Sequence, residues 1–155
     1  MGFFGIKLES PDQHAKPISL EKDYEFMYDN FVISNQQNLF VLLQEKDGVI
    51  DALNFEFTVY KYGYPNDEVG LLSKIPGIEY YEFCQVFNSK WVKELMLNNR
   101  THTRHNDSLF INDKHFVIRF KDVTLEVIAR KYDEVQLTRK DIDDFMNKEI
   151  GYIAK

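Results

Sequence analysis

Residues 39–60 read LFVLLQEKDGVIDALNFEFTVY, in which two apolar runs flank the dipeptide Asp47-Gly48. A two-residue hairpin turn needs positive φ angles, which Asp and Gly tolerate better than most residues do. After the turn, apolar residues alternate with polar or aromatic ones from Leu53 to Tyr60, so one face of an extended strand is apolar. This segment therefore predicts a β-hairpin with one buried face.

A second hairpin is predicted over residues 116–130, where two alternating apolar runs flank a turn at Lys121-Asp122. Residues 4–8 also alternate as a strand does, and residues 78–87 favour a strand because of their aromatic and β-branched content. The pattern of residues 24–33 fits a strand and a helix equally well.

Two helices are predicted from apolar spacing and capping residues. The first carries apolar residues at helical spacing over 91–96, after a cap at Asn88 or Ser89, and it stops at residues 98–99. The second is capped by Thr138 with Asp141 three positions later, and it is expected to end at Gly151. Strands interrupted by one or two short helices predict an α+β fold with a mostly antiparallel sheet.

Composition predicts one globular domain spanning residues 1–155, because 44% hydrophobic and 15% aromatic residues supply a sizeable core. The formal net charge of −6 disfavours nucleic acid as a partner and permits a protein with a basic surface. No apolar run is long enough for a membrane span, so no membrane association is expected. The single cysteine, Cys84, fits a reducing compartment, and we expect a cytoplasmic protein in which this thiol is buried and inert.

The main concentration of chemically versatile side chains lies between the first predicted helix and the second hairpin. Guanidinium groups bind phosphate or carboxylate through forked donors, and a nearby imidazole exchanges protons near neutral pH. An aspartate in this segment could orient a histidine. The alternative is a solvated loop that bonds its own backbone. The candidate ligand-binding residues are Arg100, His102, Arg104, His105, Asp107 and His115.

A metal shell at this loop would use His102 and His105 with Asp107, Asp113 or His115. The spacing matches no known zinc signature, so neither a metal ion nor another cofactor is expected. The chain also lacks a Gly-x-Ser-x-Gly motif, a phosphate-binding loop and a dinucleotide fingerprint. Whether the protein is an enzyme therefore stays open, because catalytic residues often come together from distant positions.

Other polar and aromatic positions have a structural interpretation. The carboxylates of the predicted strands are expected to face solvent, and the helical stripe at Trp91, Leu95 and Met96 is expected to face the core. Tyrosines spaced by two share one face of a strand, where they serve a protein interface or the core equally well. These carboxylates are Glu56, Glu82, Asp122 and Glu126, and these tyrosines are Tyr60, Tyr62 and Tyr64.

The segments NRTHTRHND (residues 99–107) and KHFVIRFKDVTLE (residues 114–126) resemble a block in a group of small uncharacterised bacterial proteins. The resemblance covers about forty residues, around 91–129, and implies no activity, since none is attached to that group. The group more often has histidine at the position of Lys121 and phenylalanine at that of Leu125.

Two functions follow as expectations. The first is a soluble, non-enzymatic protein-interaction module, such as an immunity or accessory factor, which masks the basic surface of another protein. The second is an enzyme or binding protein for a small anionic ligand or a metal, which uses His102, Arg104 and His105. The first rests on the acidic charge, the aromatic-rich sheet and the absence of a catalytic motif.

Overall fold

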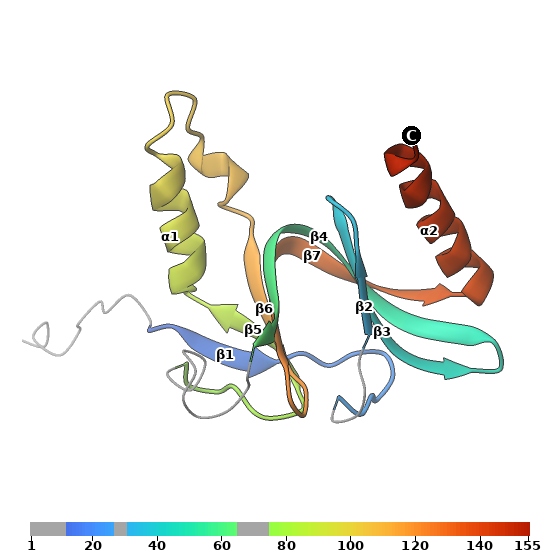
Figure 1. Ribbon diagram of the computed structural model, residues 1–155. Helices are drawn as coiled ribbons and strands as arrows, with labels where there is room; N and C mark the ends of the chain where they lie inside the picture. The colour runs from blue at the N-terminus through green and yellow to red at the C-terminus, as the bar shows by residue number, and fades with distance from the viewer. Residues whose placement is uncertain (1–11, 27–30, 65–74) are drawn as a thin grey trace, which may run out of the picture.

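A computed structural model describes residues 12–26, 31–64 and 75–155 of the chain (Figure 1). The described strands form one antiparallel sheet of seven strands in the order β1-β5-β6-β7-β4-β3-β2, which confirms the predicted α+β class. The strands are β1 (His14–Pro17), β2 (Phe31–Ser34), β3 (Asn38–Lys46), β4 (Val49–Tyr64), β5 (Phe83–Phe87), β6 (Lys114–Arg119) and β7 (Thr124–Leu137). The helices are α1 (Lys90–Asn99), the short 3-10 helix η3 (Asp107–Leu109) and α2 (Arg139–Ile153).

Both predicted hairpins are present. Strands β3 and β4 join at a tight turn in which Asp47 has a φ of 53° and Gly48 a φ of 78°, as a primed turn requires. Strands β6 and β7 pair antiparallel around a turn closed by a hydrogen bond from the Phe120 N–H to the Val123 carbonyl oxygen, 2.9 Å long. The region 78–87 forms strand β5 only from Phe83 onward. The alternation at residues 4–8 lies outside the described residues.

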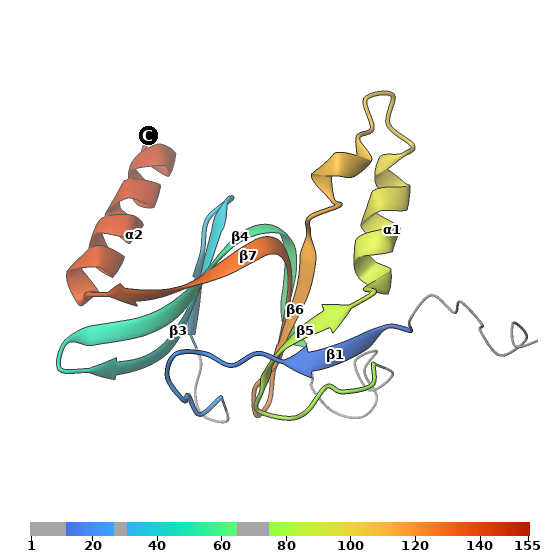
Figure 2. The ribbon, with the colours of Figure 1, turned by 180° about the vertical axis from the view of Figure 1, so that it is seen from behind.

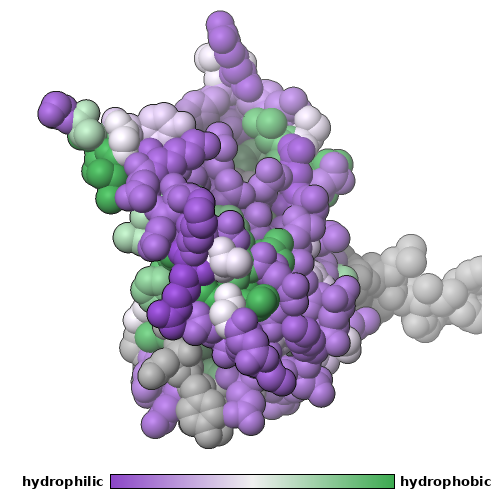
Figure 3. Space-filling model, turned by 90° about the vertical axis from the view of Figure 1, so that its right-hand side faces the viewer, coloured by the Kyte–Doolittle hydropathy of each residue, from purple (hydrophilic) through white to green (hydrophobic). Residues whose placement is uncertain are grey.

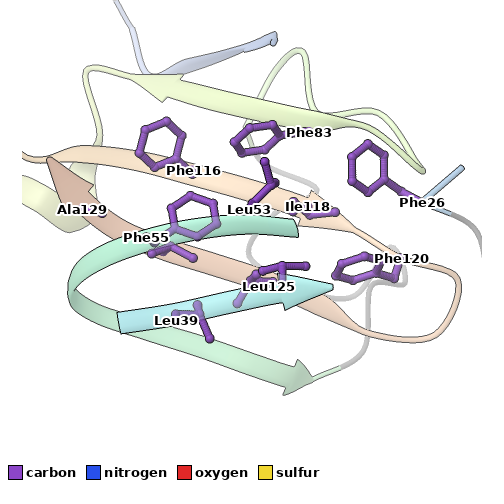
Figure 4. Packing of buried hydrophobic residues seen from close by; sticks show 12 residues of the cluster. Phe26, Leu39, Leu53, Phe55, Phe83, Phe116, Ile118, Phe120, Leu125 and Ala129 are labelled. Carbon is purple, nitrogen blue, oxygen red and sulfur yellow. The ribbon is translucent and has the colours of Figure 1, made fainter. Parts of the chain in front are cut away.

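The main core lies on one face of the sheet and is rich in aromatic rings (Figure 4). The ring of Phe55 on β4 lies 5.5 Å from that of Phe116 on β6 and 6.0 Å from that of Phe83 on β5. Residues of the segment after β1, including Tyr24 and Phe26, pack against the same core. The other face carries a smaller cluster of Ala15, Ile75, Cys84, Val86 and Val117.

Alternation along β4 is interrupted by three irregularities in its pairing with β7, between Phe55 and Phe57, between Phe57 and Val59, and between Tyr62 and Tyr64. After the first two, Tyr60 packs against the main core and its ring lies 4.8 Å from that of Phe57. Tyr62 remains 39% exposed. The three tyrosines therefore do not share one environment, and the side chain of Tyr64 lies outside the described residues.

The two helices stand out from the sheet on the same side, at opposite ends of the molecule (Figures 1 and 2). Helix α1 starts at the cap Ser89, one of the two predicted caps, and Trp91, Leu95 and Met96 are half-buried rather than fully in the core. Helix α2 starts with the predicted capping box of Thr138 and Asp141. No helix in the described part of the chain is long and apolar enough to cross a membrane.

The predicted end of α2 at Gly151 is wrong, because the helix continues to Ile153 and is closed by the bond from the Ala154 N–H to the Ile150 carbonyl oxygen. Glycine lowers the stability of a helix by only about 1 kcal/mol relative to alanine. It ends a helix where its backbone adopts a positive φ. Gly151 keeps a helical backbone, so helix α2 passes through it.

We expect Gly77→Ala to destabilise the fold by about 2 kcal/mol or more, because Gly77 has a φ of 90° and an added Cβ would overlap the Ala15 carbonyl oxygen. Gly151→Ala is the matched control. That position is helical with open space around it, so alanine should stabilise by about 0.5–1 kcal/mol. Urea unfolding of both variants measures the difference, and an unchanged Gly77→Ala midpoint would contradict the close approach.

Candidate functional site

The histidine loop, residues 100–113 between α1 and β6, lies at the far end of α1 from the sheet (Figure 1). Most of its residues are exposed. Arg100 binds Asp107 through two nitrogens, with Nη2 2.6 Å from Oδ2 and Nε 3.1 Å from Oδ1. This pairing, helped by nearby His105, lowers the pKa of Asp107 below its usual value. Asp107 therefore binds an arginine rather than orienting a histidine. His102, Arg104 and His105 are exposed.

His115 does not join this loop. It lies on strand β6, 2% exposed, on the sheet face opposite the aromatic core, where it pairs with Val86 of β5. Its imidazole contacts the Trp91 ring edge-on at 5.4 Å between centroids, at the end of α1 that meets the sheet. The structure thus divides the six predicted residues between two ends of one helix.

His115 is the centre of a buried hydrogen-bonded chain that the sequence analysis did not assemble. Its Nε2 lies 2.7 Å from Oε1 of Glu126 on β7, and its Nδ1 lies 2.8 Å from Oγ of Ser89. Ser89 and Glu126 are each 7% exposed. The expectation that Glu126 faces solvent is wrong, because α1 covers this face through Trp91. Glu56 and Asp122 are exposed, as expected, and Glu82 is partly exposed.

Local backbone structure places the serine. Strand β5 ends at Phe87, Asn88 takes a φ of 55°, and Ser89 then caps α1 by accepting a hydrogen bond from the Val92 N–H, 3.2 Å long. Asparagine tolerates this left-handed conformation better than most residues do, and serine is among the favoured N-caps. The sharp turn from strand to helix therefore carries the Ser89 hydroxyl onto the His115 ring.

A second polar site is a cleft of about 340 Å³ beside the end of β7. Asp51, only 5% exposed, accepts hydrogen bonds from Lys22 Nζ at 3.1 Å, Gln44 Nε2 at 3.0 Å and Gln136 Nε2 at 3.3 Å. The Glu21 N–H donates to Oε1 of Glu134 at 2.9 Å. We call this site the carboxylate cleft; it is lined by Glu21, Lys22, Tyr24, Asp51, Glu134, Val135 and Gln136.

The charges and hydrogen bonds of the carboxylate cleft shift the pKa values of two of its residues, Tyr24 and Asp51. Burial raises the pKa of the Tyr24 phenol, and the charges of Asp51, Glu134 and Glu21 raise it further. Burial alone would raise the pKa of Asp51, but the hydrogen bonds from Gln44, Lys22 and Gln136 outweigh burial and lower it. Asp51 is therefore ionised at neutral pH, and the cleft holds its charge in a fixed position.

Among the described residues, no group of three or more His, Cys, Asp or Glu side chains is arranged to hold a metal ion. Cys84 is buried, and burial raises the pKa of its thiol, as expected for an inert cysteine.

Asp51→Asn should lower the free energy of unfolding by about 1–3 kcal/mol, because a neutral amide loses the charge-assisted bond from Lys22. The pKa of Asp51 is lowered on folding, so its contribution is present at neutral pH and is lost as the pH falls below the ordinary value of 3.8. Urea unfolding at neutral and acidic pH should therefore show a smaller acid loss in Asp51→Asn than in wild type. Asp143→Asn, at an exposed position of α2, is the control, and an equal acid loss in wild type and Asp51→Asn would contradict this role.

Comparison with known proteins adds no relative to these observations. No family model matches the chain, and no match was found among the curated proteins or the solved structures. The geometry of the described residues is therefore the ground on which a function is proposed.

Proposed function

We propose that this chain is a protein-interaction module whose partner presents a basic segment to the carboxylate cleft. One feature supports this function above the others: three carboxylates, Glu21, Asp51 and Glu134, line the cleft against the single ammonium group of Lys22. The lining residues thus carry two negative charges in excess (three minus one). A cleft lined by one sign of charge attracts the opposite sign and speeds association with it.

The arrangement suits an ammonium or guanidinium group of a partner. Asp51 is held in place by three donors from different parts of the chain, so its oxygens need no reordering when a cation arrives. Lys22 is half-exposed at 50% of its side chain and is the one cationic group in the lining. A lysine or arginine of the partner would add a second cation to a site with excess negative charge.

Apolar contacts are also needed in an interface between proteins, and the end of α2 supplies them. Met146 is 48% exposed, Ile150 53% and Ile153 75%. They belong to the same apolar side of helix α2 as Phe145, whose ring packs against that of Phe40. Seen from the side that carries α2, hydrophobic residues form patches within a mostly hydrophilic surface (Figure 3). A groove of about 690 Å³ lies between the end of α2 and residues 34–37. A module of this kind would mask a basic surface, as an immunity or accessory factor does.

Titration with a short lysine-rich peptide tests the cleft, with a glutamate-rich peptide of equal length as the ligand control. In NMR spectra of the labelled protein, the lysine peptide should shift the amide signals of the residues that line the carboxylate cleft. The double variant Glu21→Gln, Glu134→Gln should bind about fivefold more weakly, or about 1 kcal/mol, because it loses two charges.

The matched control is the double variant Glu56→Gln, Glu94→Gln, which removes two exposed carboxylates outside the cleft. Its net charge equals that of the cleft double variant. Its affinity should stay within about twofold of wild type, since distant surface charges are screened. Equal weakening in both double variants would show binding to overall charge and would reject the cleft as the docking site.

A second candidate function keeps the histidine loop as a site for a small anion. Arg104 makes no ion pair with any described residue. It is exposed between His102 and His105, in the loop that follows helix α1. A cationic tip on an acidic chain is a favourable place for phosphate or carboxylate.

Thermal melting in the presence of inorganic phosphate tests this second function. A phosphate concentration of about 100 times the dissociation constant should add about 2.7 kcal/mol of apparent stability to wild type. His102→Ala, His105→Ala should lose that gain. A gain of the same size in the double variant, or none in wild type, would remove the loop from consideration as an anion site.

A further inference from the structure

The buried chain Glu126–His115–Ser89 has the order of groups found in serine nucleophiles: a carboxylate, an imidazole and a hydroxyl. The two heavy-atom distances, 2.7 Å and 2.8 Å, are those of well-formed hydrogen bonds. Ser89 also stands on a sharp strand-to-helix turn, directly after a residue with a φ of 55°. A nucleophilic serine on such a turn is a recurring arrangement in hydrolases.

For a neutral His115 ring, the two hydrogen bonds favour one placement of the protons. A carboxylate only accepts, so the His115 tautomer that satisfies Glu126 carries its proton on Nε2 and leaves a lone pair on Nδ1. The Ser89 hydroxyl then donates to Nδ1 and accepts from the Val92 N–H. The two ring nitrogens are exchanged relative to serine proteases, in which Nδ1 faces the carboxylate, but each group keeps its role.

We propose that Ser89 is an activated nucleophile that accepts an acyl group from small carboxylic esters. The His115 Nδ1 takes the hydroxyl proton as Oγ forms a bond to the ester carbonyl carbon, and Glu126 stabilises the imidazolium. The carbon–oxygen bond to the alcohol then breaks, and the alcohol leaves with the proton from Nδ1. Water, deprotonated by Nδ1, adds to the acyl-serine and releases the carboxylic acid, which restores the Ser89 hydroxyl.

The burial of Ser89 restricts the substrate to small esters. Ser89 itself is 7% exposed, while Phe87 two positions before it is 36% exposed and Lys90 directly after it is exposed. Phe87 and Trp91 lie two positions before and two positions after Ser89, and their rings contact His14 and His115. The Val92 N–H points at Oγ from the first turn of α1, where the helix favours the negative charge that develops on that oxygen.

A fluorophosphonate probe tests the nucleophile on the full-length wild-type protein. Intact-mass analysis should show one adduct, and peptide mapping should place it on Ser89. Two other serines are internal controls: Ser34 and Ser108 are exposed, and their hydroxyls bond a carbonyl and an amide oxygen rather than an imidazole. No adduct, or adducts on Ser34 and Ser108 at the rate of Ser89, would overturn the proposal whatever the variants do.

Variants separate reactivity from the capping role of Ser89. Ser89→Asn keeps a favoured N-cap and removes the nucleophile, so its melting temperature should stay closer to wild type than that of Ser89→Ala while the adduct disappears. Glu126→Gln keeps both Ser89 and His115 and should slow labelling and p-nitrophenyl acetate hydrolysis by about 10²-fold. Unchanged labelling in Glu126→Gln would show that the chain of hydrogen bonds is structural and would reject the activation.

Discussion

Phe55 and the rings around it hold the central strands together. Its ring lies against those of Phe83 on β5, Phe116 on β6 and Tyr132 on β7, with centroid distances between 5.5 and 6.4 Å. Tilted and edge-on contacts of this kind stabilise a core beyond the apolar area they bury. Four strands from β4 to β7 therefore share one packing centre, and the sheet on which every candidate site stands depends on it.

The face of the central strands opposite the aromatic core carries buried polar groups beside its smaller apolar cluster. Side chains alternate along a strand, so the residues next to Phe116 and Val127 point away from the aromatic core. His115 and Glu126 occupy such positions, and the N-terminal end of α1 covers them. A buried polar group is costly unless it is bonded, and this chain satisfies its imidazole on both nitrogens. The carboxylate cleft lies elsewhere, where the paired inner strands β4 and β7 meet the segment after β1.

Local signals predicted the local structure. The Asp47-Gly48 turn, the Ser89 cap and the capping box of Thr138 and Asp141 are each fixed by a few neighbouring residues, and all three are confirmed. The candidate sites depend on pairing over long distances. Glu126 meets His115 because the β6–β7 register sets it opposite Val117, the next residue of β6 on the face of His115. Its burial further requires a helix that contacts this face.

The residues of the carboxylate cleft are even harder to bring together from the sequence alone. Glu21, Asp51 and Glu134 come from three parts of the chain, and nothing in their own neighbourhoods indicates that they converge. Sequence alone predicted an acidic protein and a basic partner, but it placed the chemistry in the histidine loop, where charged residues are adjacent in the chain. Adjacent charges are easy to see in a sequence, and they often bind one another, as Arg100 and Asp107 do.

Helix α1 projects from the sheet and separates two sets of histidines. Its ten residues span about 15 Å at 1.5 Å per residue, with the imidazole of His115 against its base and the histidine loop at its tip. A tilt of about 10° at the base would sweep the tip through about 2.6 Å on that length. A change in the packing of Ser89 or Trp91 that tilted the helix would therefore move His102, Arg104 and His105 further than it moved the base.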